Sequence, residues 1–380
     1  MMQNRNTMAK ILVTGADGFI GSNLVSHLKL NDGYQILTFD INNTDDELEQ
    51  FVSEADFIFH LAGVNRPENE VEFRIGNRDL TLKIISVLRK KELTTPILIT
   101  SSVQSGVDNP YGKSKKAAED IVLKYRQQSG SAYIYRLSNV FGKWCRPNYN
   151  SVVATFCHNI ARGKEISISN RNQEVDFVYI DDVISEFVSV LEHGQCGGKK
   201  YYNVEPTYTV TLGDLADTLY KFHDISHTLC VPDFSNLFVK KLHATYLSYL
   251  PEDEFSYKLK RYKDHRGDLF ELIKSEQFGQ IFISTTKPGI QRGDHYHHTK
   301  NEKFCVIRGE AKIQLRHILK ETIISYKVSG RQPEIVDIPP GYTHSITNVG
   351  TSDVITLFWA NEIFDKEKSD TYFDRVERLK

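Results

Sequence analysis

The residue pattern of this chain changes character near residues 247–259, and this change constrains the fold more than any other feature. Before it, short apolar segments such as KILVTG, QILTFD and PILITSS alternate with segments of helical periodicity, which predicts a doubly wound parallel sheet. After it, segments such as GQIFISTT and DVITLFWANE follow one another between Gly and Pro turns, which predicts a small antiparallel barrel or jelly roll. We therefore expect an α/β domain over 9–246 and an all-β domain over 258–380.

The bulk composition limits the classes of function. A formal net charge of −2 over 380 residues gives no broad basic field for nucleic acid or an anionic membrane. No apolar run approaches the roughly 20 residues that span a bilayer. The polar start of the chain, with Met8 as an alternative first residue, lacks the apolar core of a secretory signal. The five cysteines are scattered and odd in number, which suits a reducing compartment, so we expect a cytoplasmic protein.

A glycine-rich turn joins the first predicted strand to the first predicted helix. The segment TGADGFIGSNLVSHL places Gly15, Gly18 and Gly21 at this turn. The first glycine permits a tight turn, the second lets the backbone approach a pyrophosphate, and the third allows close packing of helix on strand. The helix N-terminus then faces the phosphates. We predict a dinucleotide site here, with Phe19 and Ile20 at the start of the helix.

Asp40 ends the second predicted strand, about 20 residues after the glycines. A carboxylate at this place accepts hydrogen bonds from the adenine ribose hydroxyls and repels a 2′-phosphate, so it favours NADH over NADPH. The alternative interpretation is an ordinary turn aspartate at a strand end.

The segment YGKSK places Tyr111 and Lys115 four residues apart, on one face of a predicted helix. A lysine ammonium near the phenol lowers its pKa from about 10, so that the tyrosine can exchange a proton near neutral pH. Ser101 and Ser102 end the strand PILITSS just before this helix. We select Ser102 as the hydroxyl that orients a substrate carbonyl, with Ser101 as the alternative.

These motifs, together with HLAG, SNVFG and DFVYIDDV, resemble the extended short-chain dehydrogenase/reductase family. The resemblance implies NAD(P) binding and action on nucleotide sugars. It also places Leu61, Ala62 and Asn139 near the cofactor or the substrate.

Only eight residues separate Ser102 from Tyr111, which is a short spacing for this family. The chain departs from the family at two further places. Val175 stands where an arginine commonly precedes the DFV segment. A contact with the sugar diphosphate must then come from elsewhere, and the candidates are Lys143, Arg146 and Arg171. Val103 and Gln104 stand where the dehydratases of the family carry an Asp-Glu pair, so the resemblance implies carbonyl reduction rather than elimination of water.

Four candidate metal ligands lie in the predicted β segment. GIQRGDHYHHTKNEKFCVIRG contains His295, His297 and Glu302, and PPGYTHSITN adds His344. On two adjacent antiparallel strands, this spacing would aim three imidazoles and one carboxylate into one barrel mouth. Nitrogen and oxygen ligands suit zinc first, with nickel, iron and manganese as alternatives.

The same segments resemble two families of barrel proteins. The four candidate ligands match the two cupin motifs, whereas DHRGDLFE and RGDHYHH resemble nucleotide-sugar 3,5-epimerases, which are also cupins. In those epimerases the histidine at the place of His295 is a base and no metal is held. Glu302 and His344 favour the ligand role for His295, and a base would then be His298, Lys303 or an unassigned residue. We select His298.

From about residue 9 onward the chain resembles a family of bifunctional enzymes of capsular polysaccharide synthesis. The resemblance lies in segments such as HLAGVNRPE, DNPYGKSK, FGKWCRPNYNSVVATFC, HHTKNEKF, DIPPGYTH and DTYF. It implies a homodimer whose zinc-holding cupin domain epimerises carbon 3 of a UDP-4-keto-6-deoxy-N-acetylhexosamine. It also implies that the reductase domain then reduces the 4-ketone with NADPH to UDP-N-acetyl-6-deoxy-talosamine, on the route to UDP-N-acetyl-L-fucosamine.

Two alternatives to this function are kept open. One is a single-activity reductase whose cupin holds a structural metal, and the other is a non-catalytic NAD(P)-sensing module. The family implies NADPH whereas Asp40 favours NADH, and we keep NADPH first.

Overall fold

The computed structural model describes residues 8–67, 69–129, 131–194 and 198–378. The chain divides into two compact units. One is formed by Met1–Leu219 with Lys241–Leu250, and the other by Tyr220–Lys240 with Pro251–Lys380. The predicted first domain ran without interruption to residue 246, whereas in this division Tyr220–Lys240 belongs to the second unit. The domain bounds of 9–246 and 258–380 stay a prediction.

A five-stranded parallel sheet forms the centre of the first unit, in the order β2-β1-β3-β4-β5. Its strands are β1 (Ala9–Thr14), β2 (Tyr34–Phe39), β3 (Phe57–His60), β4 (Ile97–Ser102) and β5 (Ala132–Leu137). These strands are apolar because helices cover both faces of the sheet. The predicted doubly wound parallel sheet is confirmed.

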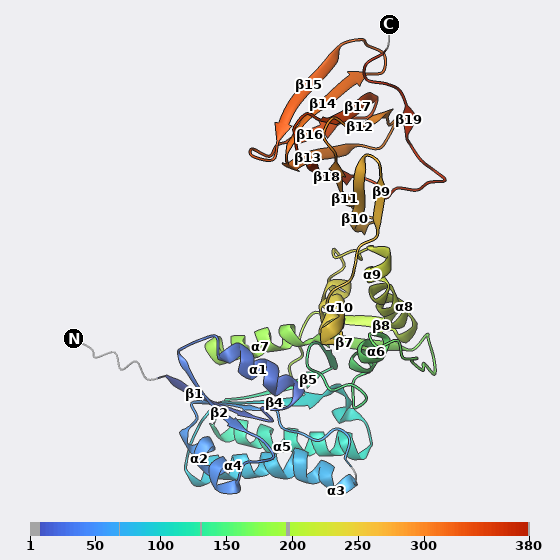
Figure 1. The fold of residues 1–380 in the computed structure, drawn as a ribbon. Helices are drawn as coiled ribbons and strands as arrows, with labels where there is room; N and C mark the ends of the chain where they lie inside the picture. The colour runs from blue at the N-terminus through green and yellow to red at the C-terminus, as the bar shows by residue number, and fades with distance from the viewer. Residues whose placement is uncertain (1–7, 68, 130, 195–197, 379–380) are drawn as a thin grey trace, which may run out of the picture. The chain divides into compact units, whose positions relative to one another are not determined.

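Helices α1 and α7 cover one face of the sheet, and α2, α4 and α5 cover the other (Figure 1). The helices and helical turns of this region are α1 (Phe19–Leu28), α2 (Asp45–Glu54), α3 (Glu70–Phe73), the π-helical turn η1 (Arg74–Asp79), α4 (Leu80–Lys90), the 3₁₀ turn η2 (Val103–Gly106), α5 (Pro110–Ser129) and α7 (Ile180–His193). Local sequence fixes their starts. For example, Thr44 and Glu47 form a capping box at the start of α2.

A second, three-stranded sheet follows the parallel sheet along the chain, in the order β6-β7-β8. Its strands are β6 (Asn139–Phe141), β7 (Glu174–Tyr179) and β8 (Thr207–Thr211). The remaining helices are α6 (Val152–Ile160), α8 (Leu212–His223), α9 (Ile225–Thr228), α10 (Leu237–Leu247) and the short 3₁₀ turn η3 (Glu252–Glu254).

The strands of the second unit form two antiparallel sheets (Figure 1). One has the order β16-β13-β18-β11-β10-β9 and the other β15-β14-β17-β12-β19. The strands are β9 (Arg261–Asp264), β10 (Gly267–Ser275), β11 (Gly279–Thr286), β12 (Gln291–Tyr296), β13 (Glu302–Arg308), β14 (Glu310–His317), β15 (Ile323–Ser329), β16 (Ile335–Ile338), β17 (Tyr342–Asn348), β18 (Val354–Ala360) and β19 (Tyr372–Phe373). Alternate residues of β18 are buried in an apolar core that both sheets share. The predicted all-β character is confirmed.

Among the described residues, no helix combines the length and the apolar character needed to cross a membrane. The four described cysteines are free, and Cys196 and residues 1–7 lie outside the described residues.

Candidate functional site

The glycine-rich turn lies at the carboxyl end of β1 and leaves no room for side chains. Gly15 has a φ of +69°, and a Cβ added there would lie 2.6 Å from the backbone nitrogen of Ala62. A Cβ on Gly21 would lie 2.0 Å from the carbonyl oxygen of Gly15. Gly18 caps α1 without a side-chain hydrogen bond, so the first-turn N–H groups of the helix are available to an anion. Phe19 and Ile20 open this helix and pack partly against the core.

Asp40, Leu61 and Ala62 surround this turn. The Asp40 carboxylate accepts 2.8 Å hydrogen bonds from the backbone N–H of Asp17 and of Ile41. Leu61 N–H donates to the carbonyl of Thr14 at 3.1 Å, which brings Ala62 against Gly15. Asp40 therefore braces the glycine-rich turn, a role that the sequence did not indicate.

Tyr111 and Lys115 lie on the first turns of α5, beside the end of β4. The Ser102 hydroxyl forms a hydrogen bond with the phenol of Tyr111. Ser101 instead donates to the buried carboxylate of Glu119 at 2.7 Å. The structure thus brings Ser102, and not Ser101, to Tyr111. Asn139 is exposed at the start of β6, and its amide donates to the carbonyl of Asp176 at 3.1 Å.

The protonation of Tyr111 differs from the sequence prediction. Burial raises the pKa of Tyr111, and the hydrogen bond with Ser102 only partly offsets this rise. Burial also lowers the pKa of Lys115 to about 8, although the charge of Glu119 acts to raise it. The prediction that Lys115 lowers the pKa of the phenol is wrong for the chain alone, because burial disfavours the charged form of both groups. The Lys115 ammonium lies 3.4 Å from the carbonyl of Thr100.

The candidates for a sugar-diphosphate contact differ in their partners. Lys143 pairs with Asp181 at 2.6 Å, and Arg171 pairs with Asp217 at 2.7 Å. Arg146 has no carboxylate partner among the described residues, and its guanidinium lies 5.4 Å from the ring centroid of Tyr149. Arg146 is therefore the candidate whose charge is not already balanced.

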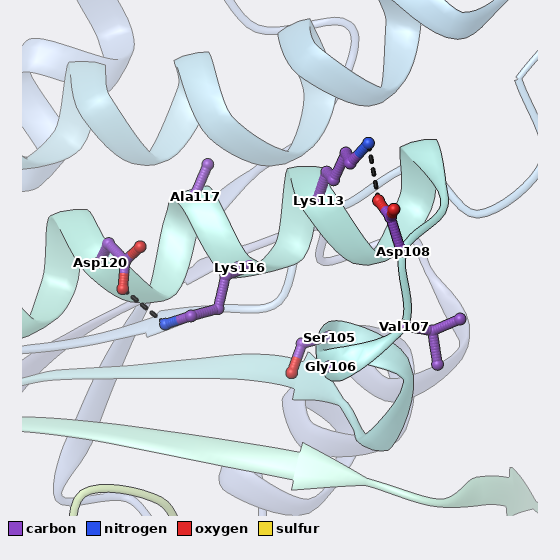
Figure 2. A pocket seen from close by; sticks show the side chains of 8 residues that line it. All are labelled: Ser105, Gly106, Val107, Asp108, Lys113, Lys116, Ala117 and Asp120. Carbon is purple, nitrogen blue, oxygen red and sulfur yellow. Dashed lines mark hydrogen bonds and ion pairs between the residues drawn. The ribbon is translucent and has the colours of Figure 1, made fainter.

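A hollow beside η2 and α5 contains none of the predicted site residues. Figure 2 shows its two lysines engaged with neighbouring carboxylates. Lys113 pairs with Asp108 at 2.7 Å, and Lys116 pairs with Asp120 at 2.6 Å. Because these charges balance one another, the hollow adds no group to the site described above.

The four predicted metal ligands come together in the second unit. One donor atom each from His295, His297, Glu302 and His344 lies within 4.8 Å of all the others. His295 on β12 is paired with His344 on β17, whereas Glu302 comes from β13 in the other sheet. The predicted geometry of two adjacent strands is therefore wrong, because the ligand set joins the two sheets across their shared interior.

The electrostatics of this cluster suit a cation. Burial, together with the charge of His344, lowers the pKa of His295 to about 4, so its imidazole is neutral. Burial alone would raise the pKa of Glu302, but its contacts with the rings of His297 and His344 and the charge of Lys300 bring this pKa below its ordinary value. Nε2 of His344 is buried without a hydrogen-bond partner among the described residues and lies 3.3 Å from Oε2 of Glu302. Three imidazoles and one carboxylate whose donor atoms lie this close together are a ligand set that fits a tetrahedral zinc ion.

Asp370 holds the loop that carries these ligands. Its backbone carbonyl accepts a hydrogen bond from Nδ1 of His297. Nε2 of the same ring is then directed toward Oε2 of Glu302, at 3.4 Å. Its carboxylate accepts from the backbone N–H groups of His298, Thr299 and Lys300 at 2.7–3.1 Å. Such outer contacts fix the tautomer and orientation of a ligating histidine. The sequence indicated Asp370 only as part of the DTYF segment.

The structure does not bring His298 to the ligand set. Its exposed side chain lies against Tyr296 and Tyr372, with ring centroids 5.3 and 4.9 Å apart. Tyr296 alternates along the chain with His295 and His297, so it points to the other face of its sheet. Lys303 is also directed elsewhere, because it pairs with Asp337. Neither candidate base faces the four ligands.

Two family models match the chain, one in each unit. Residues 11–204 match the NAD dependent epimerase/dehydratase family, and residues 262–372 match the polysaccharide biosynthesis C-terminal domain. The UDP-2-acetamido-2,6-beta-L-arabino-hexul-4-ose reductase of Pseudomonas aeruginosa is 46% identical over 364 residues, covering 96% of this chain and 98% of that protein.

Solved structures give the same result. The capsular polysaccharide assembling protein CapF from Staphylococcus aureus matches with a TM-score of 0.90 at 45% identity, over 96% of this chain and 100% of that chain. The chain belongs to the CapF family. A structure of CapF with the inhibitor 3-isopropenyl-tropolone matches at a TM-score of 0.86 and 40% identity, over 97% of this chain and 100% of that chain. The predicted resemblance to a capsular polysaccharide family is confirmed, as is the prediction of an enzyme of the NAD(P)-dependent type.

Sequence reasoning missed two residues beside the metal ligands, Asp370 and Lys300. Lys300 precedes Glu302 by two residues and lies 3.8 Å from it. In an extended segment, residues i and i+2 share a face, so this spacing was a usable signal. Asp370 had no comparable signal, because about 70 residues separate it from the loop that it holds.

Proposed function

We propose that this chain is a bifunctional nucleotide-sugar enzyme. The all-β unit, a zinc cupin, epimerises carbon 3 of a UDP-4-keto-6-deoxy-N-acetylhexosamine. The α/β unit then reduces the 4-ketone with NADPH to UDP-N-acetyl-6-deoxy-talosamine, on the route to UDP-N-acetyl-L-fucosamine for surface polysaccharide. The observation that carries the proposal is the presence of two separate sites in one chain, a Ser102–Tyr111–Lys115 set and a four-ligand cluster. The 46% identity to a protein named as the reductase of a UDP-linked 2-acetamido hexul-4-ose supports the substrate class.

The reductase residues act on the ketone oxygen. When bound, the reduced nicotinamide supplies the hydride to carbon 4. Tyr111 holds a proton on its phenolic oxygen, and because burial raises its pKa the phenol stays protonated at neutral pH. It can therefore donate this proton to the oxygen of the new alcohol. Ser102, which is hydrogen-bonded to the same phenol, orients the substrate carbonyl. Gly15, Gly18 and Gly21 leave the room that a pyrophosphate needs.

The epimerase chemistry rests on the acidity of the carbon 3 proton beside the 4-ketone. Zinc, when bound, polarises an oxygen of the substrate as a Lewis acid. His295, His297, Glu302 and His344 would hold the ion, and Asp370 orients His297. We do not assign the base to His298, whose ring lies against Tyr296 and Tyr372. From the family resemblance we also propose a homodimer, which light scattering after size-exclusion chromatography tests.

A heavy-water assay separates the two activities. Wild type, Tyr111→Phe and the exposed control Tyr220→Phe are incubated with the keto sugar and NADPH in deuterium oxide, and products are analysed by mass spectrometry. We expect Tyr111→Phe to exchange deuterium into carbon 3 without forming the alcohol, and Tyr220→Phe to behave as wild type. If wild type oxidises NADPH but no protein incorporates deuterium, the chain is a single-activity reductase with a structural metal.

A further inference from the structure

His60 is a buried histidine that the mechanism above does not use. It ends β3, and it is paired in register with Thr14, which ends β1. The two residues are 3% and 0% exposed, and residues 57–59 and 11–13 before them are buried and apolar. An apolar side chain would therefore suit the sheet at either place. β1 and β3 are also the two strands at which the strand order reverses, and ligands of such sheets bind at the carboxyl ends of these strands.

The hydrogen bonds of the His60 ring have a fixed direction. Nδ1 lies 2.7 Å from the Thr14 hydroxyl, and Nε2 lies 2.9 Å from the Thr81 hydroxyl. The Thr81 hydroxyl donates its single hydrogen to the carbonyl of Asn77 at 2.6 Å, so it accepts from Nε2–H of His60. Burial, together with the charge of Lys115, lowers the pKa of His60 to about 3, so the ring is neutral and carries only this one N–H. Nδ1 therefore accepts from Thr14.

The Nε2 side of the His60 ring leads to Tyr111. The side-chain amide of Asn77, a residue that is 2% exposed, donates to the hydroxyl of Ser114 at 2.9 Å. Ser114 in turn donates to the backbone carbonyl of Tyr111 at 2.7 Å, in the first turn of α5. Asn77 is also fixed from the other side, because its amide exchanges hydrogen bonds of 2.9 and 3.0 Å with the backbone of Val64. A continuous series of buried hydrogen bonds thus links the ring to the segment that carries Tyr111.

The Nδ1 side of the His60 ring leads to the glycine-rich turn. Because the Thr14 hydroxyl donates to Nδ1, its oxygen can accept, and the N–H of Ala62 donates to it at 3.4 Å. The carbonyl of Thr14 accepts from the N–H of Leu61 at 3.1 Å. These contacts hold both residues against Gly15, where a Cβ would lie 2.6 Å from the backbone nitrogen of Ala62. His60 thus also supports one wall of the turn that is predicted to hold the dinucleotide.

The alternative is a histidine that only satisfies the core. Such a ring needs two polar neighbours but no relation between them. The two neighbours of His60 lead instead to the two parts of the reductase site, the glycine-rich turn and the first turn of α5. In ketone reduction these two parts act on one C=O bond, because the hydride goes to its carbon and the proton of Tyr111 goes to its oxygen. Their spacing therefore has a functional meaning that the packing of the core does not require.

We propose that His60 is a positioning residue that fixes the spacing between the glycine-rich turn and the first turn of α5. This inference rests on the reductase half of the proposed function. His60 takes part in no bond-making step, since the hydride leaves the nicotinamide, the proton leaves the phenol of Tyr111, and the ring keeps its N–H throughout. Its effect is on alignment, and a misplacement of about 1 Å in such a site can slow turnover about 10²-fold.

Two variants of His60 each preserve one half of this link. In His60→Asn the amide oxygen lies closest to the place of Nδ1 and can accept from Thr14, but the side chain is too short to reach Thr81. In His60→Gln the amide nitrogen lies closest to the place of Nε2 and can donate to Thr81, whereas the bond with Thr14 is lost. His60→Leu removes both bonds. The matched control is His193→Leu, at an exposed histidine of α7 in the same unit.

The affinities of the full chain for NADPH and NADH are measured by nicotinamide fluorescence, kcat with the keto sugar by NADPH oxidation, and Tm by calorimetry. We expect His60→Gln to bind the dinucleotide about tenfold more weakly, as for loss of one buried hydrogen bond, with kcat close to wild type. We expect His60→Asn to keep the affinity and to lose kcat by about 10²-fold. His60→Leu should lose both, and His193→Leu neither. Thr14→Val and Thr81→Val remove the same two bonds from the other side and should reproduce His60→Gln and His60→Asn, respectively.

A loss of Tm without this split would overturn the proposal, because a ring that only satisfies the core would affect affinity and kcat alike in both single-bond variants. Wild-type affinity and kcat in His60→Leu would also overturn it. If a His60 variant shows no cooperative thermal transition, the threonine variant that removes the same bond replaces it. If wild type does not reduce the keto sugar, the proposed substrate fails separately. The dinucleotide affinities then decide, and equal affinities of His60→Asn and His60→Gln would contradict the role of His60.

Discussion

Replacement of Arg316 by Met tests how the C-terminal segment supports the all-β unit. Arg316 lies on β14, is 1% exposed, and is the largest fully buried side chain among the described residues. Its guanidinium makes five hydrogen bonds, to the carbonyls of His317 and Lys320 at 3.2 Å, of Val376 at 3.0 Å and of Arg375 at 2.9 Å, and to the Asp374 carboxylate at 2.7 Å. Arg316→Met keeps an apolar stem of similar length but removes every one of these donors.

The expected loss of stability follows from these contacts. Removal of one partner of a buried ion pair costs about 3–5 kcal/mol, because the other charge and its acceptors lose their compensation. Asp374 is 22% exposed and lies 3.5 Å from Arg378 as a second partner, so we take the lower end, about 3 kcal/mol. For a unit of this size each kcal/mol shifts Tm by about 2–4 °C, so the transition of the all-β unit should fall by roughly 6–12 °C.

Differential scanning calorimetry of the full chain, with hydrogen exchange of residues 370–376, measures both consequences. Arg331→Met, at an exposed arginine of the same unit, is the matched control and should leave Tm unchanged. We expect the segment around Asp370 to lose exchange protection in Arg316→Met before the sheets do. A Tm within about 1 °C of wild type, with unchanged protection of the segment, would refute the assignment of Arg316 as its anchor.

Two further predictions concern the α/β unit. Burial lowers the pKa of Lys115 in the folded chain to about 8, below the ordinary lysine value of about 10.5. The unfolded chain therefore binds the proton more tightly, and stability rises with pH from about 8 to 10.5. Below pH 8 the buried charge of Lys115 costs up to about 3 kcal/mol of stability. Lys115→Met should therefore raise Tm at pH 7, raise it by less at pH 10, and abolish reduction. A Tm below that of wild type at pH 7 would contradict this prediction. Asp40→Asn should raise the ratio of kcat/KM for NADPH over NADH by about tenfold, the factor that corresponds to 1.4 kcal/mol of lost repulsion with a 2′-phosphate. An unchanged ratio would show that the Asp40 carboxylate serves only the amides of Asp17 and Ile41.

The elements that depend on local pattern could be predicted from the sequence. The alternation of apolar segments with segments of helical periodicity predicted the parallel sheet. The TGADGFIGS motif predicted the glycine-rich turn, in which Gly15 has a φ of +69°. The four candidate metal ligands could be chosen because His295, His297 and Glu302 lie within eight residues and His344 lies in a second short motif. The roles of the individual site residues stay predictions.

The features that the sequence did not give depend on contacts between distant residues or on burial. Strand pairing decided that Glu302 faces its partners from the opposite sheet, and no local pattern carries that information. Burial decided the direction of the pKa of Tyr111, because desolvation of a phenol depends on what surrounds it. His298 was selected as a base because of its neighbours along the chain. One of the two aromatic rings that its side chain lies against belongs to Tyr372, which is 74 residues away.

The contacts of Asp370 link the metal site to the end of the chain. Its carbonyl orients His297 and its carboxylate fixes the loop that leads to Glu302, while Arg316 holds the same segment at Asp374. A metal that binds the four ligands stabilises the conformation of the loop that Asp370 also stabilises. Such coupling is reciprocal. If the docked segment increases metal affinity by a certain factor, bound metal increases the equilibrium constant for docking of the segment by the same factor. Metal removal by a chelator should therefore increase hydrogen exchange at residues 370–376, and Arg316→Met should weaken zinc binding although Arg316 contacts none of the ligands.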